Sequence, residues 1–256
     1  MPYRRVEILG TAVHSITMAQ TLDQIEEMIA ARRPGRVVTV NPEFIMEARR
    51  NPVFRRMLND ASLSVPDGVG VVWAGRLLGV PMGERVTGID LLEKFAGRAA
   101  QRGYRVYLLG AAPGVAEAAA ARLVERNPGL IVAGTYSGSP RPEEERGICE
   151  RIVAAAPDLL FVAYGSPQQE LWIGRNFENL RVPVSIGVGG AFDFVASVVP
   201  RAPTVMQRFG IEWLFRLWRQ PSRWRRMMAL PVFALLVIRS RVLGTKRLCG
   251  DIPNAA

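Results

Sequence analysis

The sequence predicts an α/β fold: a Rossmann-like, mainly parallel sheet with flanking helices, followed by a helical C-terminal appendage. Short apolar, β-branched runs end repeatedly in turn residues, and helical stretches lie between several of them. Strands that alternate with helices are typical of βαβ units, which build parallel sheets. The charge is also divided, because residues 1–200 carry 22 basic and 21 acidic side chains, whereas residues 201–256 carry 11 basic and 2 acidic. We therefore expect an α/β domain over residues 1–200 and a basic, Trp-rich helical appendage over residues 201–256.

Seven strands are expected, each an apolar run that ends in a turn signal. They are residues 5–11, 36–42, 62–68, 105–111, 130–136, 159–167 and 184–190. Helices are expected between several of these strands, for example over residues 115–127, which have an Ala-rich face, and over residues 143–156.

Four of the predicted strands finish in polar or Gly-rich segments. These segments are residues 39–42 (TVNP), 66–68 (PDG), 165–169 (GSPQQ) and 187–193 (GVGGAFD). Ligands of open parallel sheets bind beyond the carboxyl ends of the strands, so these polar groups are expected to converge at one edge. Asp67 stands out, because it places a carboxylate where a buried strand turns. The alternative is that Asp67 and Gly68 only form a turn, for which Asp-Gly is a strong signal.

The sequence argues against several chemistries. His14 is the only histidine, so a Ser-His-Asp device would depend on it alone. Cys149 and Cys249 lack the spacing of a zinc site or a disulfide scaffold, which favours a reducing compartment. Residues 187–192 begin like a dinucleotide fingerprint, but Phe192 occupies the third glycine position. The sequence has no Asp-x-Asp cluster to hold a metal against a nucleotide diphosphate, so arginine is expected to neutralise such a leaving group.

The appendage combines tryptophan and arginine in a way that suits an anionic membrane surface. Its apolar stripe of Ile211, Leu214, Phe215 and Trp218 falls at helical spacing, and Pro221 is expected to end that helix or begin another. The apolar stretch 229–238 follows but is only about half as long as a membrane span. The alternatives are a stripe that docks onto the sheet and, less favoured, a nucleic-acid-binding segment.

Several motifs together resemble the WecG/TagA/CpsF family of bacterial glycosyltransferases. The motifs are TVNPEF, VPDGVGVVWAGRLLG, ERVTGIDLL, YLLGAAPG, VAYGSPQQELWI, GVGGAFDFVAS and RAPTVMQRFGIEWLFRLWRQPSRWRRM, in this order from about residue 8 to about residue 240. The resemblance implies inverting transfer of a sugar, such as N-acetylmannosamine or a relative, from a UDP-sugar to an undecaprenyl-diphosphate-linked acceptor. It places this reaction in cell-surface polysaccharide or teichoic acid synthesis and implies no cofactor and no metal.

The resemblance also carries roles to individual residues. Asp67 matches the proposed catalytic base, and Arg216 and Arg223 match arginines that stabilise the leaving UDP. Substrate-binding positions are implied for Thr39, Asn41, Arg85, Gln169, Gly190, Asp193 and Arg226. For Arg85 an equally weighted alternative is a structural ion pair with Asp90 beside the pocket. One departure is Gln168, where the family often has Lys or Arg.

The expected partners are the UDP-sugar donor, the lipid-linked acceptor and an anionic membrane surface, with no nucleic acid. We expect a cytoplasmic protein that is peripheral on the inner face of the cell membrane, and homo-oligomerisation is possible. Two other functions remain open at this point. One is a nicotinamide-dependent α/β oxidoreductase, and the other is a non-catalytic, membrane-associated protein of polysaccharide assembly.

Overall fold

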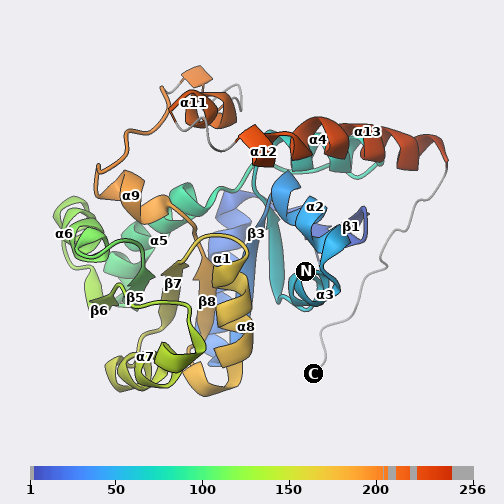
Figure 1. Cartoon of the computed structure of the whole chain (residues 1–256). Coiled ribbons are helices and arrows are strands. Elements are labelled where there is room, and N and C mark those ends of the chain that lie inside the picture. Colours follow the sequence, from blue (N-terminus) through green and yellow to red (C-terminus); the bar gives the residue numbers. More distant parts are fainter. Residues whose placement is uncertain (1–2, 204, 207–211, 220–223, 244–256) are drawn as a thin grey trace.

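The protein is built on one six-stranded parallel sheet and a separate two-stranded hairpin (Figure 1). The structure, a computed structural model, describes residues 3–203, 205–206, 212–219 and 224–243. The strands are β1 Arg5–Ile8, β2 Thr11–His14, β3 Gly35–Val40, β4 Leu63–Pro66, β5 Arg105–Gly110, β6 Ile131–Tyr136, β7 Leu159–Ala163 and β8 Val184–Gly187. The large sheet has the order β4-β3-β8-β7-β5-β6, and all its neighbours pair in parallel. This topology confirms the predicted Rossmann-like α/β class.

One strand expectation was wrong in detail. Residues 5–11 do not form a single strand, because Leu9 and Gly10 both have positive φ and turn the chain back into β2. Positive φ at two successive residues is the signature of the tight turns that join antiparallel strands. The hairpin then packs beside β4, where the Ser64 N–H donates a 3.0 Å hydrogen bond to Nδ1 of His14.

Helices cover both faces of the sheet, which makes three layers. One face carries α1 Met18–Ala31, α5 Gly88–Arg102, α6 Val115–Arg126 and α9 Ala191–Val195. The other carries α2 Pro42–Arg50, α3 Pro52–Asn59, α7 Pro142–Ala155 and α8 Gln168–Leu180. Strands β7 and β8 are buried along their whole length, as expected for the centre of a sheet that is covered on both faces.

Local sequence explains where the first helices of the second face begin. Asn41 and Asn51 are each followed by proline, and each side-chain oxygen accepts a hydrogen bond from the backbone N–H three residues on. Asparagine is a strong N-cap residue, and proline at the first helical position has no N–H to leave unpaired. The repeated Asn-Pro therefore ends β3 at the sheet edge and starts α2 and then α3.

The described part of the appendage lies over the carboxyl ends of the strands (Figure 1). It consists of α11 Glu212–Arg219, α12 Trp224–Met227 and α13 Ala229–Val242. Phe233 and Val237 of α13 are buried in one apolar cluster with α2 and with α4 Val69–Leu77, so one side of the 229–238 stretch packs on the body. Among the described residues, no helix has both the length and the apolar character needed to cross a membrane. Pro221 lies outside the described residues.

Candidate active site

Asp67 lies at the carboxyl edge of the sheet, directly after β4. Its backbone N–H donates a 2.7 Å hydrogen bond to the Val40 carbonyl, which ties the end of β4 to the end of β3. Gly68 follows with φ of +104°, a conformation that a side chain would strain. The Pro66 carbonyl accepts a 2.8 Å hydrogen bond from the Val86 N–H, so the segment that leads into α5 is fixed to the same turn. The half-buried Asp67 carboxylate is therefore held on a backbone that is tied on two sides.

Thr39 and Asn41 occupy the end of β3, next to Asp67. Thr39 is buried, and its hydroxyl lies 3.5 Å from the Gly187 carbonyl oxygen of β8. Asn41 uses its side-chain oxygen to cap α2 through the Phe44 N–H at 2.9 Å. Both residues thus lie at the predicted edge, and the hydrogen bonds described for them help to build it.

The loop after β8 brings the third group of predicted residues to this edge. Gly190 precedes α9, and Asp193 lies in the first turn of that helix. The Gly189 N–H donates a 2.9 Å hydrogen bond to the side-chain oxygen of Gln169, which is buried at the start of α8. Gln169 therefore supports the β8 loop, and its contact with substrate remains a prediction.

The neighbouring Glu170 is a buried acid that sequence reasoning did not single out. Its Oε1 accepts a 2.7 Å hydrogen bond from the Gln169 amide, and it is 4% exposed. Burial raises its pKa to about 8, although the hydrogen bond from Gln169 and one from its own backbone act in the opposite direction. The available signal was the adjacent Gln-Glu pair that follows a strand. It did not identify Glu170 as buried, because a charged residue in the first turn of a helix is usually solvated.

Arg85 forms an ion pair, but its partner is not the one expected from the sequence. Its Nη1 lies 2.7 Å from Oε2 of Glu212, the first residue of α11. Asp90 instead pairs with Arg201, with Nη2 to Oδ1 at 2.7 Å. The Arg201 Nε also lies 3.4 Å from Oε1 of Glu212. The predicted Arg85–Asp90 pair is therefore replaced by a network that joins the body to the appendage. Arg201 and Glu212 were missed because their partners are distant in the sequence.

The chain was compared with known proteins. Residues 6–247 match the profile of the family described as "Glycosyl transferase WecG/TagA/CpsF family". The chain belongs to this glycosyltransferase family. A Bacillus spizizenii protein named N-acetylglucosaminyldiphosphoundecaprenol N-acetyl-beta-D-mannosaminyltransferase is 37% identical over 203 residues, which cover 79% of this chain and 78% of the relative. Proteins of the same name from Bacillus subtilis and Staphylococcus aureus (strain MW2) are 34% and 32% identical, covering 85% and 93% of both chains. The match confirms the expected glycosyltransferase and leaves the oxidoreductase and the non-catalytic alternative without support.

The structure describes the tail arginines of this glycosyltransferase only in part. Arg216 belongs to α11 and Arg226 to α12, and their side chains are outside the described part of the structure. Arg223 lies outside the described residues altogether. Their roles toward the leaving group remain predictions.

His14 and a cluster of metal ligands are the two other features that could carry chemistry. His14 is buried, and burial first, then the charge of Arg5, lower its pKa to about 4, against the contact of its Nδ1 with the Ser64 carbonyl oxygen at 3.2 Å, which acts to raise it. A neutral imidazole enclosed in the hairpin contact is structural. Within the described residues, no group of three or more His, Cys, Asp or Glu side chains could hold a metal ion. Independence from metal remains a prediction.

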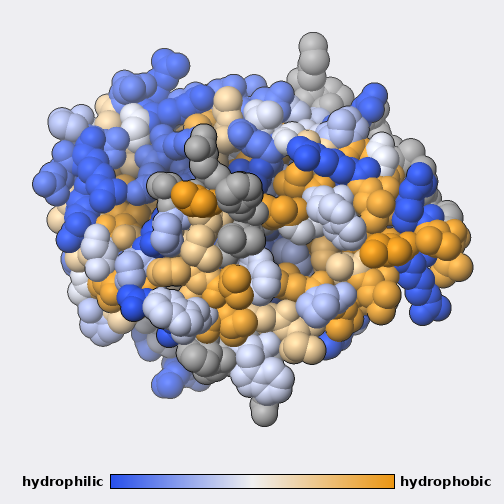
Figure 2. Space-filling model, turned by 90° about the horizontal axis from the view of Figure 1, so that it is seen from above, coloured by the Kyte–Doolittle hydropathy of each residue, from blue (hydrophilic) through white to orange (hydrophobic). Residues whose placement is uncertain are grey.

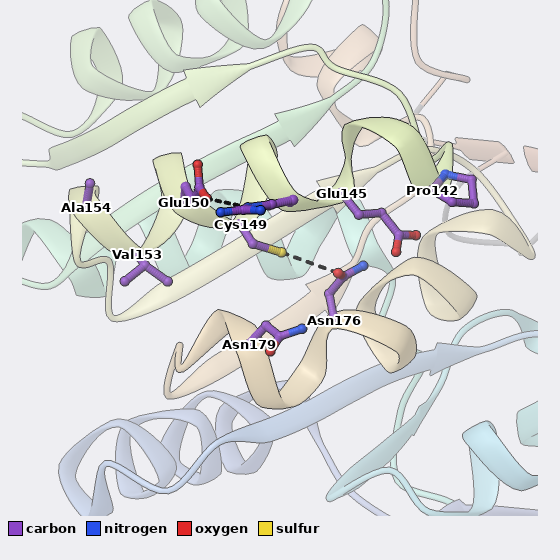
Figure 3. A pocket seen from close by; sticks show the side chains of 9 residues that line it. Pro142, Glu145, Cys149, Glu150, Val153, Ala154, Asn176 and Asn179 are labelled. Atoms are coloured by element: carbon purple, nitrogen blue, oxygen red, sulfur yellow. Dashed lines mark hydrogen bonds and ion pairs between the residues drawn. The ribbon is translucent and has the colours of Figure 1, made fainter.

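A cavity of about 710 Å³ lies between α7 and α8, away from this edge (Figure 3). The Cys149 thiol lies on its wall and donates a 3.3 Å hydrogen bond to the Asn176 side-chain oxygen. Burial raises the pKa of this thiol to about 11, which makes it a poor nucleophile. None of the predicted site residues whose side chains the structure describes lines this cavity.

Proposed function

We propose that this glycosyltransferase moves an N-acetylmannosamine-type sugar from a UDP-sugar to an N-acetylglucosaminyl-diphosphoundecaprenol acceptor. The observation that carries the proposal is the match of nearly the whole chain to relatives named for this transfer. The position of Asp67 at the carboxyl edge of a parallel sheet supports it, because this edge is where such folds bind their ligands.

The reaction is a direct displacement with inversion at the anomeric carbon. Asp67 accepts the proton of the acceptor hydroxyl as the hydroxyl oxygen bonds to the donor's anomeric carbon. The bond from that carbon to the UDP oxygen breaks at the same time, and UDP leaves with the electron pair. Arg216, Arg223 and Arg226 balance the charge that develops on the leaving diphosphate. A positioned carboxylate base contributes about 10²–10⁴-fold in rate.

The donor lies against the ends of β3 and β8 in this proposal. Thr39, Asn41, Gly190 and Asp193 offer hydroxyl, amide, backbone and carboxylate groups for the uridine and sugar hydroxyls. Gln169 acts by holding the loop that contains Gly190, since its described hydrogen bonds lie within the protein. Arg85 is the cation next to this surface and faces an anionic group of the donor after exchanging its partner Glu212.

The lipid-linked acceptor requires a membrane, and the proposed contact is an exposed apolar surface, here called the apolar rim. The rim spans α4, α11, α12 and α13, and consists of Val69, Trp73, Trp213, Leu214, Trp218, Trp224, Met228, Val232, Leu235, Ile238, Val242 and Leu243. Figure 2 shows hydrophobic side chains gathered on this face, with hydrophilic ones between them. The exposed Arg239 and Arg241 supply positive charge beside the rim. Anionic lipid of the cytoplasmic leaflet complements this combination.

The test is UDP release from a panel of UDP-sugars with a soluble lipid-diphosphate acceptor analogue in EDTA. We expect acceptor-dependent release by the wild type and about 10²–10⁴-fold slower release by Asp67→Asn. Asp60→Asn is the matched control, because Asp60 lies at the opposite end of β4 and is exposed. Equal release by wild type and Asp67→Asn would remove Asp67 as the base. UDP release by the wild type that occurs without EDTA and is lost when EDTA is added would contradict metal independence.

A further inference from the structure

Glu212 is an unusual residue for its surroundings. Residues 201–256 contain eleven basic side chains and only two acidic ones, Glu212 and Asp251. Glu212 begins α11 and is only 14% exposed at its side chain, whereas Leu214 and Trp218 of the same helix are largely exposed. An acid that begins a helix is favourable for the helix dipole, but that effect does not need burial against the body.

The carboxylate of Glu212 is enclosed by two guanidinium groups of the body side. Oε2 lies 2.7 Å from Nη1 of Arg85, and Oε1 lies 3.4 Å from Nε of Arg201. Both arginine side chains are about one-fifth exposed, at 20% and 22%. Pairs of this kind are screened less by solvent than fully exposed pairs, and hydrogen bonds between charged groups are the stronger class.

Arg201 links Glu212 to the first turn of α5. Its Nη2 lies 2.7 Å from Oδ1 of Asp90, and its Nη1 lies 3.8 Å from Oε2 of Glu93. Burial acts to lower the pKa of Arg201, but the hydrogen bond and charge of Asp90 and the charge of Glu212 outweigh it and raise the pKa. Arg201 is thus a permanent cation placed among three carboxylates.

This network is connected to the turn that carries Asp67. The other oxygen of Asp90 accepts a 2.6 Å hydrogen bond from the Thr87 hydroxyl, and Thr87 caps α5. The preceding residue, Val86, donates its N–H to the carbonyl of Pro66, immediately before Asp67. A short path of ion pairs, hydrogen bonds and adjacent residues therefore joins α11 to the backbone turn that carries the proposed catalytic Asp67.

We propose that Glu212, Arg201 and Asp90 form an ionic latch that positions α11, and with it residue 216, over the strand-end edge. Glu212 is a positioning residue, because its carboxylate is taken up by ion pairs with Arg85 and Arg201. Residue 216 belongs to the same helix, α11, and lies one turn after Glu212. The catalytic part of this inference rests on the proposed function. The structural part, that the latch holds α11 in place, does not.

The structural part is tested by amide hydrogen exchange of residues 213–219 in the full chain. The variants are Glu212→Gln, Arg201→Gln and the double variant, with Arg146→Gln as control, because the ion pair that Arg146 makes among the described residues is with the exposed Glu150 in α7. We expect Glu212→Gln to exchange about tenfold faster and Arg201→Gln, which keeps the 2.7 Å pair of Glu212 with Arg85, to exchange faster by a smaller factor. The double variant should add little to Glu212→Gln, and the control should match the wild type. Raising the salt concentration should speed exchange in the wild type and have less effect in Glu212→Gln. Unchanged exchange in both single variants, or full exchange of the wild type at the shortest time, would overturn the latch.

The positioning role is tested by acceptor-dependent UDP release in the same proteins. We expect kcat to fall about tenfold in Glu212→Gln and by a smaller factor in Arg201→Gln, with no loss in the double variant beyond that of Glu212→Gln, while the thermal midpoint of the body stays constant. Faster exchange with undiminished kcat would overturn the positioning role and leave the structural latch standing. A wild type that releases no UDP but shows the exchange pattern would count against the proposed function and not against the latch.

Discussion

Glu170 is a buried acid whose ionised form would destabilise the fold but whose neutral form fits its surroundings. Its carboxyl group is buried beneath the β8 loop, where it orients the Gln169 amide that accepts from Gly189. Its Oε2 is buried without a hydrogen-bond partner among the described groups, and an ionised carboxylate would be expensive there. The pKa of about 8 means that the acid is largely protonated at neutral pH, and its neutral form is compatible with this environment.

The raised pKa of Glu170 predicts a specific dependence of stability on pH. The folded-state pKa of about 8 lies above the ordinary value of 4.5, so between these pH values the folded state keeps a proton that the unfolded state has lost. The contribution of Glu170 to the free energy of unfolding is greatest below pH 4.5. It declines as the pH rises toward 8, by up to about 1.4 kcal/mol per pH unit. Glu170→Gln should therefore gain stability relative to the wild type as pH rises, as measured by urea unfolding at pH 5.5, 7 and 8.5. Glu150→Gln, an exposed change of the same kind, should track the wild type, and an identical pH trend in Glu170→Gln would disprove the assignment.

The residues of the site differ in how far the sequence alone can predict them. Asp67 and Asn41 follow from local pattern, because an apolar run that stops at Asp-Gly or Asn-Pro identifies the end of a strand. The Arg85–Glu212 pair joins residues 127 positions apart, and no local pattern reports such a contact. Gln169 was predicted as a residue of the site, but the sequence could not show that its side chain is buried, because that depends on how β8 passes over it.

At the scale of elements, the parallel sheet was predictable because its strands are short apolar runs with fixed spacing from helices. The hairpin was not, because a Leu-Gly turn inside an otherwise apolar run gives little local signal. The packing of α13 was also missed. Its sequence is apolar on nearly all sides, so the choice of Phe233 and Val237 as the buried pair comes from the shape of the surface formed by α2 and α4.

The end of β8 must contain glycine because α8 approaches it closely. A Cβ on Gly187 would lie 2.5 Å from Nε2 of Gln169 and still nearer to Oε1 of Glu170. Gly187→Ala should therefore displace the Gln169–Glu170 pair and lower the free energy of unfolding by about 1–3 kcal/mol. Gly147→Ala in the exposed part of α7 is the matched control, since no atom lies within 4 Å of its added Cβ. It should stabilise the protein by about 0.5–1 kcal/mol. Equal effects in urea unfolding would contradict the close approach.

At the scale of the whole molecule, the two sides of the appendage have different roles. One side closes the body: Phe233 and Val237 are buried against α2 and α4, and Glu212 is held by the latch. The other side carries the apolar rim, whose residues are exposed. Removing the appendage would disturb both tasks at once, so only point changes on one side can tell them apart.

The rim therefore predicts that membrane binding and folding respond to different residues of the same helix. Leu235 is 67% exposed and Phe233 is 2% exposed, two positions apart in α13. Leu235→Ser combined with Trp218→Ser should reduce binding to vesicles that contain phosphatidylglycerol by about tenfold or more, because each side chain buried in the interface contributes about 1.5–3 kcal/mol. The free energy of unfolding should change little in this variant, whereas Phe233→Ala should lower it by about 3–5 kcal/mol.

Val124→Ser on α6 is the control, since Val124 is also apolar and is 40% exposed but belongs to a helix outside the rim. The measurement is vesicle co-flotation beside urea unfolding. Unchanged flotation of the double variant would mean that the rim is not the membrane contact. Equal flotation of the wild type on vesicles of phosphatidylcholine alone would show that charge does not contribute.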